Sequence, residues 1–146
     1  MSEEIARLTE LHMQGFHCSQ IIMIVGLEWQ GKNNPDLVRA MNGLAGGLGF
    51  NGKNCGTLTA GVCLLALYGG RGQLEEQENP HLNKMIQDLV EWFEITYTKE
   101  YGGIDCQHIM NNDPFNRLMR CPDVVIKTYF KVKEILQDNG FLSITS

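Results

Sequence analysis

The stretch that decides the fold class is residues 79–103, NPHLNKMIQDLVEWFEITYTKEYGG. Asn79-Pro80 is typical of a helix start, because asparagine caps a first turn and proline fits the first helical position. Gly102-Gly103 favour the end of a helix. Between these signals, apolar residues recur at the spacing of one helix face: Leu82, Met85, Ile86, Leu89, Phe93 and Tyr97. The stretch therefore predicts a long amphipathic helix that ends at about Tyr101.

The same helical signals continue on both sides of this stretch. Further helices are expected over residues 3–14, 19–30 and 55–68, and onward from Asn34-Pro35, Asp105 and Cys121-Pro122. The β-branched run 21–25 could form a strand, but its length and the Gly and Glu that follow favour a buried helix. We predict an all-α fold, with residues 1–146 forming a single-domain helical bundle of about six or seven helices. A Gly-rich loop should precede the helix that begins near Cys55.

Composition and charge exclude several classes of protein. Apolar residues make up 43% and charged residues 20% of the 146 residues, a balance typical of a globular domain rather than a disordered chain. The net charge of −5 argues against a nucleic-acid partner. No apolar run approaches the ~20 residues that cross a bilayer, so no membrane association is expected. The acidic residues Glu3 and Glu4 do not fit a signal peptide, and we expect a soluble, cytoplasmic protein.

The five cysteines are the chemically distinctive feature of the chain. They are Cys18, Cys55, Cys63, Cys106 and Cys121. They are too few for a disulfide scaffold, which needs about 8–10% cysteine. No two have the C-x-x-C spacing, which excludes a thioredoxin-type motif and a zinc ribbon. In a reducing compartment, such cysteines are more often catalytic, redox-sensing or metal-binding than bridged.

Four of these cysteines coincide with predicted helix starts: Cys18, Cys55, Cys106 and Cys121. The positive end of a helix dipole stabilises a thiolate, so these positions should lower the pKa of each thiol. Each also has a cation-capable neighbour in the sequence, and these neighbours are His17, Lys53, His108 and Arg120. Cys63 differs, because it lies in the middle of a helix among apolar residues and is expected only to pack.

A second glycine pattern lies just before Cys55. Residues 47–52, GLGFNG, match the G-x-G-x-x-G dinucleotide fingerprint. That fingerprint needs a preceding strand inside a βαβ unit, whereas a helix is expected here. We interpret the segment as a tightly turned loop that positions Cys55, with backbone N–H groups that could hold an anion or a sulfur cluster.

The cysteines and their flanking glycines resemble one known family. The segments are GFHCSQ at 15–20, GGLG at 46–49 and CGTLTAG at 55–61, followed by Cys106 and Cys121. In this order they resemble the C_GCAxxG_C_C family, single-domain proteins of about this size that are described as redox-active. The resemblance implies that Cys18, Cys55, Cys106 and Cys121 are the functional cysteines and that Cys63 is additional.

The leading hypothesis is thiol–disulfide chemistry by these four cysteines, with a redox partner that no motif identifies. A helix-end thiolate would attack an oxidised partner, and a second cysteine would resolve the mixed disulfide. Cys55 is the expected attacking residue, since the Gly-rich loop and Lys53 should leave it approachable and electropositive. The alternative is a metal ion or an iron–sulfur cluster held by Cys18, Cys55, Cys106 and Cys121. A third hypothesis is a helical interaction module with unreactive thiols. The cofactor, the oligomeric state and whether the chain is an enzyme stay open.

Overall fold

The computed structural model describes residues 2–144, and this part of the chain is helical without strands. The helices are α1 (Ser2–Met13), α2 (Cys18–Trp29), α3 (Pro35–Met41), α4 (Ala45–Leu48), α5 (Gly56–Gly69), α6 (Leu82–Tyr101), α7 (Cys106–Met110), α8 (Asn116–Met119) and α9 (Cys121–Asp138), with a 3-10 turn η1 (Asn42–Leu44). The all-α prediction is confirmed, and seven of the described helices have five or more residues. The one-turn helices α4 and α8 were not predicted. The strand alternative for residues 21–25 is wrong, because they lie inside α2.

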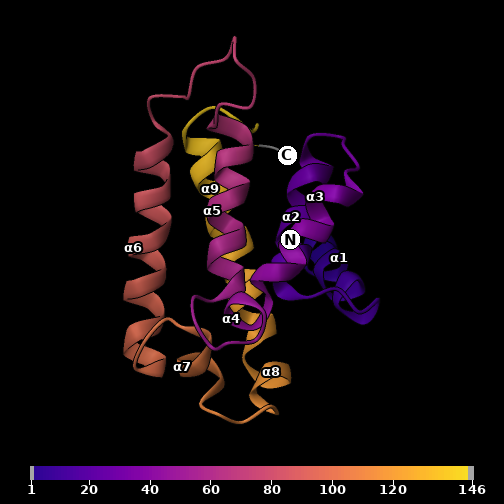
Figure 1. Ribbon diagram of the computed structural model, residues 1–146, viewed down its shortest axis with the longest axis vertical. Coiled ribbons are helices and arrows are strands. Elements are labelled where there is room, and N and C mark those ends of the chain that lie inside the picture. Colours follow the sequence, from indigo (N-terminus) through magenta and orange to yellow (C-terminus); the bar gives the residue numbers. More distant parts are fainter. Residues whose placement is uncertain (1, 145–146) are drawn as a thin grey trace.

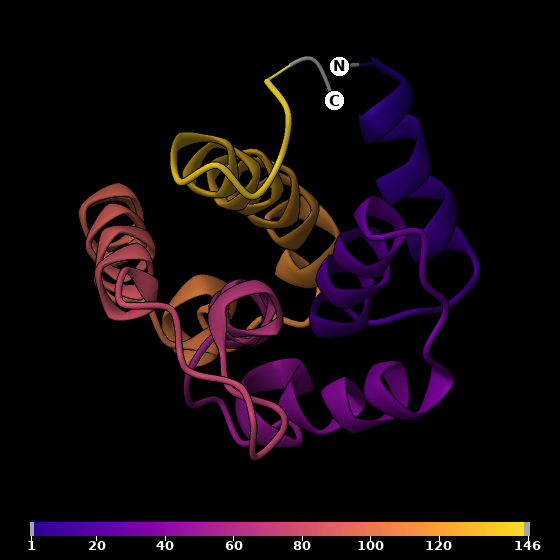
Figure 2. The same cartoon turned by 90° about the horizontal axis from the view of Figure 1, so that it is seen from above.

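The long helices α5, α6 and α9 run side by side along the long axis of the molecule (Figure 1). Seen from above, α5 lies among α2, α6 and α9, while α1 and α3 lie on the outside (Figure 2). The apolar face predicted for α6 turns inward, and five of its six residues are buried: Leu82, Met85, Leu89, Phe93 and Tyr97. Burial of this face is what holds an amphipathic helix in a bundle.

The tightest helix contact joins α2 to α5. A Cβ added to Gly26 would lie 2.1 Å from Leu64 Cδ1, and a Cβ added to Gly56 would lie 3.3 Å from Cys18 Sγ. On α2, Gly26 follows Cys18 by as many residues as Leu64 follows Gly56 on α5. Because the contacts occur in the same order along both helices, α2 and α5 run parallel and in register. Their N-terminal ends therefore meet at one end of the bundle.

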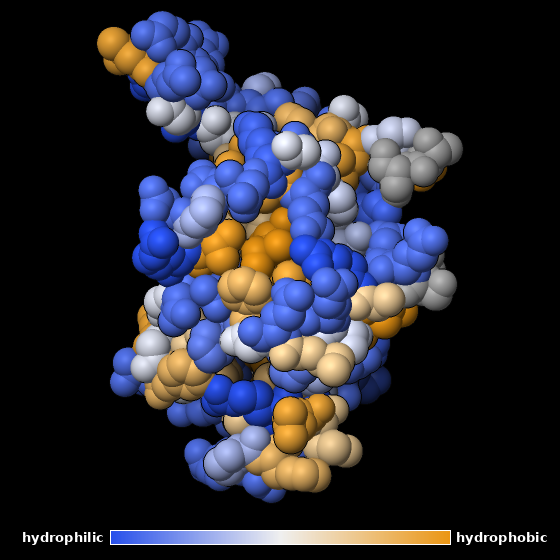
Figure 3. Space-filling model, turned by 90° about the vertical axis from the view of Figure 1, so that its right-hand side faces the viewer, coloured by the Kyte–Doolittle hydropathy of each residue, from blue (hydrophilic) through white to orange (hydrophobic). Residues whose placement is uncertain are grey.

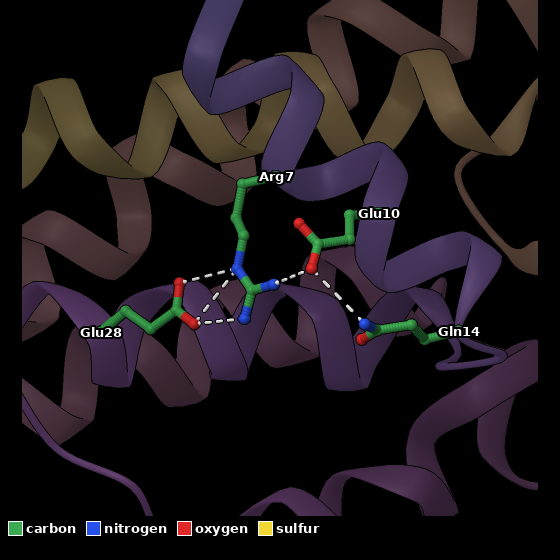
Figure 4. A network of polar contacts seen from close by, with 4 residues as sticks. All are labelled: Arg7, Glu10, Gln14 and Glu28. Carbon is green, nitrogen blue, oxygen red and sulfur yellow. Dashed lines mark hydrogen bonds and ion pairs between the residues drawn. The ribbon is translucent and has the colours of Figure 1, made fainter.

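A polar network ties α1 to α2 on the surface (Figure 4). Arg7 Nη2 donates to Glu28 Oε2 at 2.6 Å, and Arg7 Nη1 donates to Glu10 Oε1 at 3.0 Å. Exposed ion pairs of this kind contribute about 0–1 kcal/mol. The buried side chains of Leu8 and Leu11 hold α1 in place more strongly.

The end of the bundle that holds α7 and α8 shows apolar surface to solvent. α8 and the residue before it expose Phe115, Leu118 and Met119, each more than half exposed. Apolar side chains gather at this lower end in the space-filling view (Figure 3). The same end receives the first turns of α5 and α9 (Figure 1).

The close packing of α2 on α5 gives a test of the fold. We expect Gly26→Ala to lower the free energy of unfolding by about 1–3 kcal/mol, because the new methyl group overlaps Leu64, which is only 1% exposed. Gly43→Ala is the matched control, since a Cβ there meets nothing within 4 Å. Urea unfolding of both variants measures the difference, and equal stabilities would contradict the packing.

Candidate functional site

Each of the four motif cysteines begins a helix, as predicted. Cys18, Cys106 and Cys121 are the first residues of α2, α7 and α9, and Cys55 is the N-cap residue of α5. Cys63 lies inside α5 and packs against the core. The sequence thus placed all five cysteines correctly relative to the helices.

The start of α2 is held by polar contacts to its own first turn and to α3. The backbone N–H of His17 donates to Gln20 Oε1 at 3.1 Å. The hydroxyl of Ser19, which is fully buried, donates to the carbonyl oxygen of Met41 at 2.7 Å. Because both groups lie beside Cys18 in the chain, these bonds fix the position of its thiol.

The loop before α5 pairs with the start of α7. The Cys106 N–H donates to the Lys53 carbonyl at 2.7 Å, and the Gln107 N–H donates to the Gly52 carbonyl at 3.1 Å. Asn54 and Asp105 form an isolated antiparallel β-bridge beside them. This backbone pairing brings Cys106 next to the segment that carries Cys55, although the two cysteines are far apart in sequence.

Glycines permit the backbone to turn so tightly at this point. Residues 46–50 all have φ between 63° and 76°, a left-handed run that only glycine adopts freely. Gly47 has no alternative, because a Cβ there would lie 2.4 Å from the Lys53 backbone nitrogen and 2.9 Å from Cys106 Cβ. The G-x-G-x-x-G match thus begins within the one-turn helix α4 and turns the chain toward Cys106, with no strand before it among residues 2–144.

The four motif cysteines line one cavity of about 220 Å³. Cys63 does not line it. Apolar side chains make up most of the remaining wall, together with Met110, whose Sδ lies 4.0 Å from Cys121 Sγ. The cavity is the structural feature that separates the four motif cysteines from the fifth.

The thiols interact electrostatically with one another, and Cys18 acts on each of Cys55, Cys106 and Cys121. Burial, then the nearby Cys18, raises the pKa of Cys55 to about 12. Burial and the charges of Cys18 and Cys106 raise the pKa of Cys121 to about 11. The pKa of Cys106 is also raised, first by burial and in part by Cys18, while Arg117 opposes the shift.

Two expectations about these thiols are wrong. The helix starts were expected to lower the pKa of each thiol, but burial raises it for Cys55, Cys106 and Cys121, since desolvation disfavours a thiolate more than a helix end favours it. Cys55 was expected to be approachable, yet it is only 7% exposed.

Arg117 is a cation whose charge acts on the thiols, and the sequence did not single it out. Its positive charge acts on Cys106 and Cys121, and its guanidinium lies 4.7 Å from the centre of the Phe50 ring. Among the predicted neighbours, Arg120 instead lies over Tyr101 and donates to the Ile109 carbonyl. No periodicity or motif in the sequence marks Arg117 as a residue of the site. It lies in the one-turn helix α8, and only the fold brings this helix to the cavity.

Phe50 and Met110 also line the cavity, and sequence reasoning singled out neither of them. The Phe50 ring also packs edge-on against His17, with ring centres 5.5 Å apart. No spacing signal distinguishes either residue from other apolar positions. Only the fold brings them to the thiols.

The described part of the chain does not arrange its ligands for a metal. No group of three or more His, Cys, Asp or Glu side chains among residues 2–144 is placed to hold an ion. All five cysteines are free thiols.

No helix among residues 2–144 is long and apolar enough to cross a membrane.

The raised pKa of Cys55 predicts how stability depends on pH. A thiol whose pKa is about 12 in the folded state and ~8.5 in the unfolded chain stabilises the fold fully below pH 8.5, and this contribution is lost as the pH rises toward 12. Between pH 8 and pH 10, wild type should lose about 2 kcal/mol more unfolding free energy than Cys55→Ala. Urea unfolding with a reductant present measures this. Equal losses would show that the Cys55 thiol is not shielded from water.

The comparison with known proteins rests on one family. The sequence model of the family described as "Putative redox-active protein (C_GCAxxG_C_C)" matches residues 16–135, which span all four cavity cysteines. No curated protein and no solved structure matches the chain. Because this match covers most of the sequence, the chain belongs to the C_GCAxxG_C_C family.

Proposed function

We propose that Cys18, Cys55, Cys106 and Cys121 form a thiol–disulfide redox centre in a cytoplasmic protein. The observation that carries the proposal is that these four cysteines line one cavity, while Cys63 lies outside it. The family description, which assigns redox activity, supports the same chemistry. A disulfide needs two thiols that can approach each other, and a shared cavity provides that proximity.

Cys106 is the proposed attacking residue. It is half-buried rather than buried, and the charge of Arg117 favours its thiolate. Cys55, by contrast, is 7% exposed and has a pKa of about 12. A thiol that is both covered and protonated at neutral pH is a poor nucleophile.

Cys18 is the proposed resolving residue. It is the one cysteine whose charge acts on each of Cys55, Cys106 and Cys121. A residue central to the cluster can reach a mixed disulfide on a neighbour with little movement of the backbone.

The reaction oxidises two cysteines and reduces one disulfide. The Cys106 thiolate attacks a disulfide R–S–S–R, forming a mixed disulfide and releasing RS⁻. The Cys18 thiolate attacks the Cys106 sulfur, forming the Cys18–Cys106 disulfide and releasing a second RS⁻. The protons lost by the two cysteines end on the two departing thiolates, so two thiols replace the disulfide consumed.

Disulfide formation tests the proposal. The reduced protein is treated without oxygen with bis(2-hydroxyethyl) disulfide, alkylated with N-ethylmaleimide and analysed by intact-mass and peptide spectrometry. We expect an internal Cys18–Cys106 disulfide in wild type and in Cys63→Ser. Cys18→Ser should stop at the mixed disulfide on Cys106, because the resolving thiol is absent. Oxidation of Cys63 as fast as the cavity thiols, or no loss of thiols, would contradict the proposal.

Metal binding is the second candidate function, and the sulfur content of the cavity favours it. Four thiols and the Met110 thioether are soft ligands of the kind that zinc, copper(I) and iron–sulfur clusters take. Elemental analysis and a visible spectrum after anaerobic purification separate the two functions. Stoichiometric metal with all four thiols protected would favour this candidate, and a colourless, metal-free protein would favour the thiol–disulfide centre. If all five cysteines of the metal-free protein resist alkylation until the protein unfolds, both functions are wrong and a plain interaction module remains.

A further inference from the structure

The cavity has a charge opposite to that of the chain. The whole sequence carries a net charge of −5, yet within residues 2–144 no Asp or Glu lines the cavity. The charged or titratable nitrogen groups that do line it are His12, His17 and Arg117. This distribution favours an anionic ligand in an otherwise apolar space.

Arg117 is the arginine with spare hydrogen-bonding capacity. All five arginines lie within residues 2–144, and the other four have partners: Arg7 with Glu28, Arg39 with Asp36, Arg71 with the Gln73 and Leu74 carbonyls, and Arg120 with the Ile109 carbonyl. In the same part of the chain, the guanidinium of Arg117 makes no hydrogen bond or ion pair, and its central carbon lies over the ring of Phe50. Its N–H edge is therefore free to bind a carboxylate through two parallel hydrogen bonds.

The size and depth of the cavity point to a small molecule. A cavity of about 150 Å³ accommodates benzene, so about 220 Å³ accommodates a molecule with a few more heavy atoms. None of the four cavity thiols is exposed, as Cys55 is buried and the other three are partly buried. A cysteine on the surface of a folded protein would have to enter the cavity to reach them.

We propose that the substrate of the thiol centre is a small organic disulfide that carries a carboxylate, bound by the guanidinium of Arg117 with its sulfur atoms toward Cys106 and Cys18. This inference rests on the proposed function and adds its substrate class. The guanidinium carbon of Arg117 lies over the Phe50 ring, 4.7 Å from its centre. Arg117, Cys106 and Cys18 line the same cavity, so a disulfide bound by Arg117 would lie within reach of the attacking thiol.

The redox balance follows from the thiol–disulfide reaction. The Cys106 sulfur bonds to one sulfur of the substrate, the S–S bond of the substrate breaks, and a carboxylate-bearing thiolate leaves. The Cys18 sulfur then bonds to Cys106 and releases the second carboxylate-bearing thiolate. The protein is oxidised by two electrons and the substrate is reduced to two thiols, which take the two cysteine protons.

Three reagents of similar size and different charge test the inference. Oxidation rates of the reduced protein are measured with dithiodiglycolate, which is anionic, bis(2-hydroxyethyl) disulfide, which is neutral, and cystamine, which is cationic. Intrinsic reactivity differs among the reagents, so the rate for each is expressed as the ratio of wild type to Arg117→Gln. We expect that ratio to be about 10- to 100-fold larger for dithiodiglycolate than for cystamine, because only the anion loses a charge-assisted hydrogen bond.

Arg39→Gln is the matched control, since it removes the same charge from an exposed arginine that does not line the cavity. It should give equal ratios for the three reagents. Equal ratios for Arg117→Gln, with all reagents still forming the Cys18–Cys106 disulfide, would overturn the substrate class and leave the redox centre standing. If no reagent oxidises the wild type while N-ethylmaleimide still labels the cavity thiols, the redox function itself fails.

Discussion

The parallel packing of α2 on α5 is the constraint on which the rest of the structure depends. Gly26 lets α2 approach α5 closely enough to enclose Leu64, and Gly56 lets the start of α5 meet Cys18. Because the two helices are parallel and in register, Cys18 and Cys55 are carried to the same end of the bundle. A side chain at either glycine would separate the helices and with them the two thiols. The fold and the cysteine cavity therefore share one interface.

Burial and helix ends act in opposite directions on the thiols of this cavity. A helix start carries a partial positive charge of roughly half an elementary charge, which stabilises an anion in the first turn. Removal from water disfavours the thiolate more strongly than this charge favours it. The pKa values of Cys55, Cys106 and Cys121 are therefore raised. Burial therefore disfavours the thiolate at each of these three cysteines. Arg117 is the cation that opposes the shift at Cys106 and Cys121. In the proposed mechanism, the residue that binds the substrate also favours the thiolate of the attacking Cys106.

The helices themselves were predictable because their signals are local. The spacing of apolar residues along α6, the Asn-Pro starts and the glycine ends act within a few residues, so the order of helices and the position of each cysteine at a helix start were correct. The exposure of Cys55 and the direction of the pKa shifts were wrong. Both depend on what packs against a residue from elsewhere in the chain, because burial leaves Cys55 only 7% exposed and is the largest cause of the raised pKa of Cys55, Cys106 and Cys121. The one-turn helix α8 was missed because four residues carry too little periodicity to recognise.

The sequence by itself determined the all-α class, the separation of Cys63 from the other four cysteines, and the family resemblance. Each of these follows from the spacing of residue types along the sequence. Only the tertiary structure decided that the four cysteines share a cavity, that Cys55 is covered, and that Arg117 and Phe50 stand beside the thiols. Contacts between residues distant in sequence depend on how whole helices pack. Desolvation, which governs the chemistry of a thiol, is a property of that packing and not of the residue or its neighbours in the chain.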